Sequence, residues 1–246
     1  MMLVIQIEES SMQIAGTTAL VTGANRGIGK AFADALLDRG AAKVYAGVRD
    51  VTTITDPRVV AVQLDVTDPD RGAEVARELG DVELLVNNAG GARPGTPVTA
   101  TLEGARAELE MNYLSVVSMT QAFAPVLAAN GGGAIVNMLS VASWVGMPML
   151  STYAASKSAA WAFSNASRVE LAPQGTAVVG VHVGWVDTDL VAAVDAPKVT
   201  PAAVAAAAFD ALEAGEPEAL VDDYSRHVKA SLPDDQATLY APAISG

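Results

Sequence analysis

Tyr153 and Lys157 stand four residues apart in an alanine-rich segment with helical periodicity. Four residues make about one turn of a helix, so the phenol and the ammonium group project from the same face. A tyrosine with its ordinary pKa of about 10 is a poor acid or base at neutral pH, but a nearby cation favours the phenolate and lowers that pKa. The pair therefore predicts proton transfer with a substrate oxygen, provided that the surrounding residues supply the rest of a site.

Ser140 lies at the end of an apolar run, 134–139, that predicts a buried strand. Its hydroxyl could hydrogen-bond the same substrate oxygen as Tyr153. The loop between Ser140 and the predicted helix must lie beside the reacting centre, because both of its ends carry candidate catalytic residues. This loop predicts an apolar substrate pocket, the alternative being that its large side chains pack inward or at a subunit contact. The pocket candidates in the loop are Trp144, Met147, Met149 and Leu150.

A glycine-rich stretch near the start of the chain predicts a phosphate-binding loop. Residues 17–21 read as a strand and 30–39 as a helix, and Thr22-Gly23-Ala24-Asn25-Arg26-Gly27-Ile28-Gly29 joins them. Small residues let the backbone approach a pyrophosphate, and the helix N-terminus presents free N–H groups to it. The residues expected to contact a dinucleotide here are Gly23, Asn25, Arg26, Gly27, Ile28 and Gly29.

Together, Thr-Gly-x-x-x-Gly-x-Gly and Tyr-x-x-x-Lys resemble the short-chain dehydrogenase/reductase family, and the resemblance extends from about Thr17 to Thr188. It implies a single-domain, doubly wound α/β fold: a Rossmann-like parallel sheet with helices on both faces. It also implies hydride transfer to a carbonyl carbon, with Tyr153 as the general acid or base. Lys157 would hold the nicotinamide ribose and lower the pKa of the phenol, while Ser140 would orient the reacting oxygen.

The resemblance assigns further residues. Asn112, in the middle of a long predicted helix at 101–130, matches the family's catalytic Asn, which bends this helix and holds a water next to the lysine. The alternative is a solvent-facing polar residue. Asp65 follows the third predicted strand, where the family places a carboxylate against the adenine. The remaining cofactor contacts that the resemblance implies are Val66, Asn88, Ala89, Gly90, Gly184, Val186 and Thr188.

The identity of the cofactor depends on the residue after the second predicted strand, 43–48. An acidic side chain there would accept a hydrogen bond from a free ribose 2'-hydroxyl, but Val48 and Arg49 offer no acceptor. Arg26 lies close to the same ribose in this fold, and two guanidinium groups suit a 2'-phosphate. The alternative is that both arginines are solvated surface residues. We expect NADP(H).

Three regions depart from the family pattern. Residues 50–58 are too short and too poor in helix formers for the usual crossover helix, so we expect an irregular loop or a single turn. Residues 1–11 are expected to be an extension outside the fold, which leaves 12–246 as a single NADP(H)-binding catalytic domain. The tail after Asp223 has no assignment. His182 alternates with apolar strand residues, which favours a structural role.

Composition limits the classes of partner. Hydrophobic residues make up 51% of the chain and aromatic residues only 5%, which suits helices packed closely on a parallel sheet. A net charge of −13 disfavours nucleic acid and anionic membrane, and the absence of cysteine makes the cytoplasm the default compartment. No cluster has metal-ligand spacing, so no metal is expected. Alanine-rich helix faces favour a homo-oligomer, a dimer or a tetramer, although they equally suit packing on the sheet.

These features favour an NADPH-dependent carbonyl reductase or alcohol dehydrogenase that acts on an apolar or aromatic ketone or aldehyde. Trp185 and Leu190 could form the second wall of the pocket, and the segment that contains them lacks Arg and Lys up to Lys198. Two alternatives remain open: an NADP(H)-binding sensor or scaffold without turnover, and a lyase or epimerase on the same fold.

Overall fold

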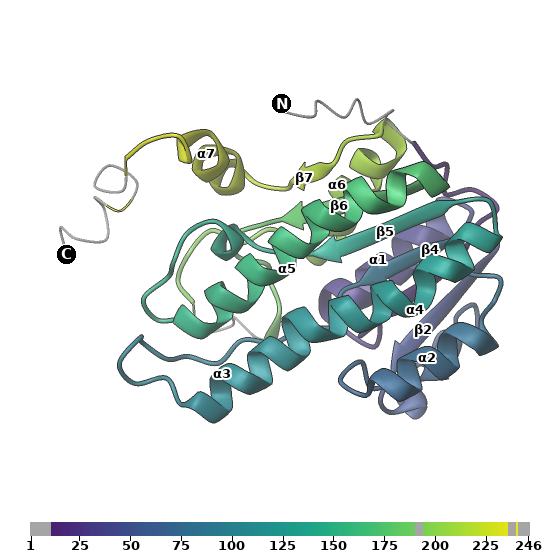
Figure 1. Ribbon diagram of the computed structural model, residues 1–246, viewed down its shortest axis with the longest axis horizontal. Helices are drawn as coiled ribbons and strands as arrows, with labels where there is room; N and C mark the ends of the chain where they lie inside the picture. Colours follow the sequence, from purple (N-terminus) through teal and green to yellow (C-terminus); the bar gives the residue numbers. More distant parts are fainter. Residues whose placement is uncertain (1–10, 190–193, 236–239, 241–246) are drawn as a thin grey trace.

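The computed structural model describes residues 11–189, 194–235 and 240, and a seven-stranded parallel sheet forms its centre (Figure 1). The strand order is β3-β2-β1-β4-β5-β6-β7, so the chain runs from β1 to one edge and then crosses back to build the other half. This doubly wound order confirms the predicted fold class. The strands are β1 (Thr18–Thr22), β2 (Lys43–Val48), β3 (Val60–Gln63), β4 (Leu84–Asn87), β5 (Gly133–Met138), β6 (Thr176–His182) and β7 (Glu218–Leu220).

Helices cover both faces of the sheet (Figure 1). On one face, α1 (Gly27–Asp38) and α6 (Pro201–Ala214) pack through Phe32 and Phe209, whose rings meet edge to face at 5.4 Å. On the other face lie α2 (Pro69–Glu78), α4 (Ser115–Ala129) and α5 (Ser151–Leu171). Because both faces are covered, the central strands are mostly apolar, and all five residues of β1 are buried.

The long helix predicted at 101–130 is present, with a local change of pitch. It begins as α3 (Leu102–Leu109), where the Thr101 hydroxyl accepts the Gly104 N–H at 3.0 Å. It then forms a π-helical turn, Glu110–Leu114, before continuing as α4. A π turn bends a helix and displaces one residue from the regular ladder. The displaced stretch contains Asn112.

The predicted loop at 50–58 contains one 3₁₀ turn, Val51–Thr53, which the Asp50 side chain caps. The edge strand β3 is thinly covered as a result, and Val60 on it is 47% exposed. At the other edge, β7 is followed by α7 (Asp223–Ser231), so part of the unassigned tail is helical. Residues 1–10 lie outside the described part of the chain. Within that part, no helix has the length and hydropathy needed to cross a membrane.

Candidate active site

Lys157 and Tyr153 lie one turn apart on α5, beside the carboxyl end of β5, as their spacing predicted. Lys157 is buried, and its Nζ donates a hydrogen bond to the Met138 carbonyl oxygen at 2.7 Å. The same Nζ lies 5.9 Å from the centre of the Tyr153 ring. The last residue of β5 therefore anchors the ammonium group next to the phenol.

Asn112 is fully buried, so the solvent-facing alternative is wrong. Its Nδ2 donates to the Gly91 carbonyl at 2.8 Å and to the Ser156 hydroxyl at 3.0 Å, and its Oδ1 accepts the Gly91 N–H at 2.9 Å. A Cβ built on Gly90 would lie 3.0 Å from Asn112 Oδ1 and 3.6 Å from Lys157 Nζ. The π turn thus brings Asn112 against the turn after β4 and close to the lysine.

Ser140 lies two residues beyond β5 and is buried at the start of a 3₁₀ turn, Val141–Ser143. Its Oγ accepts the Ala142 N–H at 3.1 Å, and its own N–H donates to Ser143 Oγ at 3.3 Å. Sequence reasoning missed the role of Ser143. The signal was the Ser-x-x-Ser spacing, a variant of the capping box in which the two residues satisfy each other's backbone donors.

The electrostatics of the pair differ from the sequence expectation. Burial raises the pKa of Tyr153 above its ordinary value, and a hydrogen bond with Ser140 opposes this while the charge of Glu108 adds to it. Burial also lowers the pKa of Lys157 to about 8. The sequence predicted a phenol pKa lowered by Lys157. In the chain itself the contribution that lowers the phenol pKa comes from Ser140, and burial outweighs it.

Glu108 is a buried carboxylate that sequence reasoning also missed. It lies on α3 one turn before Asn112, and its Oε1 accepts the Arg93 N–H at 2.7 Å. Its Oε2 accepts the Thr152 hydroxyl at the start of α5. Glu108 thereby ties the loop after β4 to the helix that carries Tyr153. Nothing in the local sequence separates it from Glu110, which is exposed.

The glycine loop has the geometry that an anion requires. Gly23 and Gly27 have positive φ values of 68° and 53°, and a Cβ on Gly29 would lie only 2.1 Å from the Gly23 carbonyl oxygen. Arg26 is the N-cap of α1 and makes no side-chain capping hydrogen bond. Among the residues that the structure describes, the first N–H groups of α1 therefore have no side-chain acceptor, which fits the pyrophosphate of a dinucleotide.

The turn after β4 braces this loop. Thr22 Oγ1 accepts the N–H groups of Asn88 and Ala89, each at 3.0 Å, and Asn88 Nδ2 donates to the Thr22 carbonyl at 2.9 Å. The Asn88 side chain thus holds the loop in place. From the other side, Thr188 Cγ2 lies 3.4 Å from a Cβ built on Gly27. Two segments predicted to bind the cofactor, the turn after β4 and the segment that carries Thr188, therefore both contact the glycine loop.

The two arginines expected near the ribose are both on the surface. Arg49 is exposed directly after β2, and Arg26 is 75% exposed with its Nη1 3.3 Å from Asp189 Oδ2. Asp65 Oδ1 accepts the Thr67 N–H at 3.0 Å and the Thr67 hydroxyl at 2.7 Å. These hydrogen bonds, with a smaller contribution from the Arg49 charge, lower the pKa of Asp65. Arg49 and Asp65 are therefore neighbours at the end of the sheet where the adenosine is expected.

Of the residues predicted to line the apolar pocket, one packs inside the protein and others are exposed or half-buried. Trp144 packs inward: its ring stacks on His182 at 3.8 Å between centroids, and its Nε1 is buried without a partner in the described part of the chain. The packed alternative therefore describes Trp144. Met149 is 61% exposed, and Leu150 forms an isolated bridge with Gly95. Met147 and Trp185 are half-buried, whereas Leu190 lies outside the described residues.

No group of three or more His, Asp or Glu side chains among the described residues could hold a metal ion. The titratable groups at the candidate site are Tyr153, Lys157 and Glu108, with the Ser140 hydroxyl beside them. This set suits proton transfer. The adjacent glycine loop suits a phosphorylated cofactor.

The chain is similar to known short chain dehydrogenases. A family model described as short chain dehydrogenase matches residues 17–198. A short chain dehydrogenase of Monascus purpureus is 34% identical over 194 residues, which cover 71% of this chain and 66% of that protein. A 3-oxoacyl-[acyl-carrier-protein] reductase of Synechocystis is 33% identical over 186 residues, covering 70% of this chain and 75% of that one.

Two solved structures resemble this chain over 94% of its length, which is more than the matched residues 17–198. The crystal structure of a short chain dehydrogenase from Burkholderia cenocepacia in complex with NADP has a TM-score of 0.90 and 40% identity. It covers 94% of this chain and 98% of that one. A short-chain dehydrogenase from Streptomyces avermitilis has a TM-score of 0.78 and 25% identity, covering 94% and 99%.

Proposed function

The chain belongs to the short-chain dehydrogenase/reductase family of oxidoreductases, and from that premise we propose that it is an NADPH-dependent reductase of apolar or aromatic ketones and aldehydes. One observation carries the proposal. Tyr153, Lys157 and Ser140 surround the carboxyl end of β5, next to a glycine loop whose helix N-terminus has no side-chain cap. Acid–base groups and an anion-binding loop thus serve one site.

NADP(H) is the proposed cofactor. Gly23, Gly27 and Gly29 would admit its pyrophosphate, and Arg26 and Arg49 would pair with the 2'-phosphate. The Burkholderia protein, which was solved with NADP, supports this choice. When bound, NADPH supplies the hydride that reduces the carbonyl carbon.

Tyr153 would donate its phenolic proton to the carbonyl oxygen as the hydride arrives, so that the product is an alcohol. The raised pKa of Tyr153 keeps the phenol protonated at neutral pH, which suits reduction. Ser140 would hold the reacting oxygen through its hydroxyl. Lys157, already fixed by the Met138 carbonyl, would bind the ribose hydroxyls and offset the negative charge left on Tyr153.

We propose that the substrate lies between the loop 147–150 and Trp185, with Met147 and Leu150 as apolar contacts. The segments 140–150 and 184–189 contain no Arg or Lys, so neither offers a cation to a carboxylate or phosphate. We therefore expect a neutral substrate. Trp144 is not included, because its ring is stacked on His182.

The substrate proposal is tested by comparing kcat/KM for an aryl ketone with that for a keto acid of similar size, using NADPH. We expect the aryl ketone to be preferred and Trp185→Ala to reduce that preference. Leu102→Ala, at an exposed position at the start of α3, is the matched control and should leave the ratio unchanged. A preference for the keto acid would contradict the proposed pocket.

We also propose a homo-oligomer, a dimer or a tetramer. Large apolar side chains on the helical face that carries α4 and α5 are exposed, among them Leu114 and Val169. Such residues are commonly covered at subunit contacts. Sedimentation of the purified protein should give a mass at least twice that of the chain, and a monomer at micromolar concentration would contradict this proposal.

A further inference from the structure

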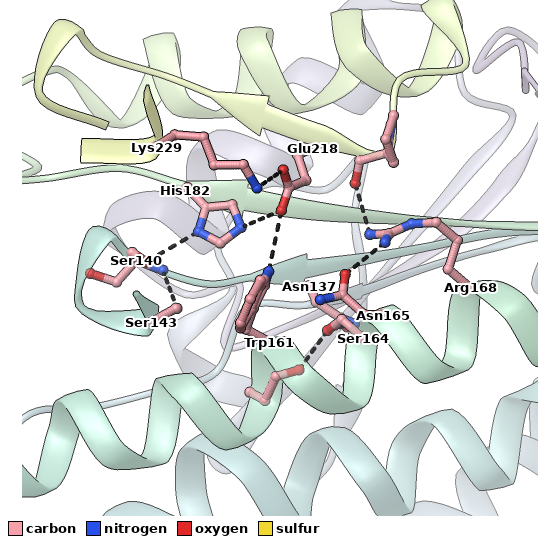
Figure 2. Close-up of polar contacts among 12 residues, drawn as sticks. Asn137, Ser140, Ser143, Trp161, Ser164, Asn165, Arg168, His182, Glu218 and Lys229 are labelled. Atoms are coloured by element: carbon pink, nitrogen blue, oxygen red, sulfur yellow. Dashed lines mark hydrogen bonds and ion pairs between the residues drawn. The ribbon is translucent and has the colours of Figure 1, made fainter. Parts of the chain in front are cut away.

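A polar cluster formed by His182, Glu218 and Lys229 lies next to Ser140 (Figure 2). None of these three residues takes part in the proposed reaction. His182, at the end of β6, is fully buried, and its Nδ1 lies 3.1 Å from the Ser140 carbonyl oxygen. Its ring stacks on Trp144 with an angle of 18° between the planes. The ring is therefore fixed on one face and along one edge. The edge that carries Nδ1 points at the peptide of the candidate catalytic serine.

The partners of His182 determine which nitrogen carries the proton. The Ser140 carbonyl can only accept a hydrogen bond, so Nδ1 must carry a hydrogen for a favourable contact at 3.1 Å. Burial holds the pKa of His182 below its ordinary value, so the ring is neutral with one N–H. Nε2 then carries the lone pair and lies 3.5 Å from Glu218 Oε1 without a hydrogen bond.

The position of Glu218 is fixed by hydrogen bonds from two other side chains. Its Oε2 accepts Lys229 Nζ at 2.6 Å, and its Oε1 accepts Trp161 Nε1 at 3.2 Å. Lys229 Nζ also lies 4.9 Å from the centre of the Trp144 ring. Figure 2 shows Glu218 between His182, Lys229 and Trp161. The carboxylate thus lies along the second edge of the imidazole, and the lysine contacts the Trp144 ring that stacks on it.

We propose that His182 is a positioning residue for Ser140: its Nδ1–H fixes the Ser140 peptide, while the stacked Trp144 ring, which Lys229 contacts, holds the imidazole in place. Ser140 is then held at both sides of its backbone, by Ser143 Oγ at the N–H and by His182 together with the Ser143 N–H at the carbonyl. The inference rests on the proposed function, because fixing Ser140 matters to turnover only if its hydroxyl orients the reacting oxygen.

The proposal gives a role to the C-terminal segment, which includes the tail after Asp223 that has no assignment from the sequence. Glu218 and Lys229 lie beyond the matched residues 17–198. Two further contacts join this segment to the same place: the Val221 N–H donates to the His182 carbonyl at 3.0 Å, and the Gly184 N–H donates to Asp222 Oδ2 at 2.9 Å. We infer that β7 and α7 hold the end of β6 in the position that His182 requires.

Two amide substitutions separate a positioning role from simple packing. In His182→Asn the amide nitrogen can occupy the place of Nδ1, whereas in His182→Gln it reaches the place of Nε2. We expect His182→Gln to lower kcat by roughly 10-fold to 100-fold, because a small misplacement of a catalytic group has effects of this size. His182→Asn should recover most of kcat, and the Kd for NADPH should change in neither variant. Equal losses in both variants, or a loss confined to KM, would overturn the proposal.

Lys229→Met tests the contribution of α7. It removes the cation that pairs with Glu218 but keeps a side chain of similar length. It should lower kcat by a smaller factor than His182→Gln. Unchanged kcat would overturn the part of the proposal that involves α7. Each variant is first compared with the wild type by thermal unfolding and by NADPH binding, so that only folded protein enters the comparison.

The tautomer supplies a readout that does not require turnover. The chain has two histidines, so nitrogen NMR of the wild type and of His227→Gln assigns the His182 signals without ambiguity. We expect a neutral ring with the proton on Nδ1. A proton on Nε2 would overturn the proposal even if the enzyme is active. If no carbonyl compound is reduced, the proposed function fails while the tautomer still tests the contact between His182 and Ser140.

Discussion

The candidate site has a cofactor half and a catalytic half, and the two are formed by different chemical groups. The cofactor half depends on backbone: the turn at Gly23 and Gly27, and the uncapped N-terminus of α1. Its charged side chains, Arg26 and Arg49, are exposed. The catalytic half depends on buried polar side chains. Such side chains keep their places only if every neighbour satisfies their hydrogen bonds, so a substitution should affect the two halves in different ways.

The catalytic half also carries an electrostatic cost that the cofactor half avoids. Lys157 is buried with the Met138 carbonyl as its hydrogen-bond partner, and its pKa falls to about 8 as a result. Burying a charge with so little compensation lowers stability. The same burial fixes the groups before the substrate arrives, which favours catalysis because fixed groups need no reorganisation during the reaction.

The largest effect on the two halves together is expected from Lys157→Met, which removes the ammonium group and keeps an apolar side chain of similar length. Turnover should fall by about 100-fold to 10,000-fold, the range of an acid–base contribution, because the negative charge left on Tyr153 would lose the cation that offsets it. NADPH should also bind more weakly, because the same ammonium is proposed to hold the ribose. A variant that lost turnover and bound NADPH normally would break the proposed link between the two halves at this residue.

Gly29→Ala should damage the cofactor half while sparing the catalytic half. The added Cβ would lie 2.1 Å from the Gly23 carbonyl oxygen, so the backbone of the loop must move. We expect the Kd for NADPH to rise by about 100-fold, whereas kcat at saturating cofactor changes little. Gly80→Ala is the matched control, because a Cβ there meets no atom within 4 Å. Normal NADPH binding by Gly29→Ala would contradict the loop assignment.

These differences explain what could be predicted from the sequence. The glycine loop and the Tyr153–Lys157 pair were predictable because local spacing determines the geometry of a turn and of a helix face. The contacts of Ser140 with His182 and of Glu108 with Arg93 join residues from different elements, and no local pattern encodes them. The sequence predicts Trp144 in the pocket, but a large loop residue can face inward or outward. Its orientation depends on its stacking on His182, which the local sequence does not encode.

Arg49→Ala should sharpen the comparison by removing a side chain from the cofactor half without disturbing its backbone. Charge-assisted hydrogen bonds contribute about 1.5–3 kcal/mol, so the Kd for NADPH should rise by roughly 10-fold to 100-fold. The Kd for NADH should hardly change, because NADH has no 2'-phosphate. Arg77→Ala, on an exposed face of α2, is the control. Equal losses for both cofactors would refute the assignment of Arg49.

A further predicted effect is on stability and its dependence on pH. The pKa of Lys157 is lower in the folded chain than in the unfolded one, so the unfolded chain binds more protons between the two values. The burial penalty is therefore fully present below pH 8 and is relieved as the pH rises from about 8 to about 10.5. Denaturant unfolding should show wild type gaining up to about 3 kcal/mol relative to Lys157→Met over this range. A difference independent of pH would mean that Lys157 is not desolvated.

The central claim is that Tyr153 supplies the proton for a reduction at this site, and Tyr153→Phe tests it most directly. NADPH consumption and alcohol formation are measured together for a panel of ketones and aldehydes, and the Kd for NADPH is measured in the same samples. We predict that wild type consumes one NADPH for each alcohol formed, and that Tyr153→Phe binds NADPH almost as tightly but has no measurable turnover. A Tyr153→Phe variant that kept about a tenth of wild-type turnover would contradict the claim, because an acid–base group contributes at least about 100-fold.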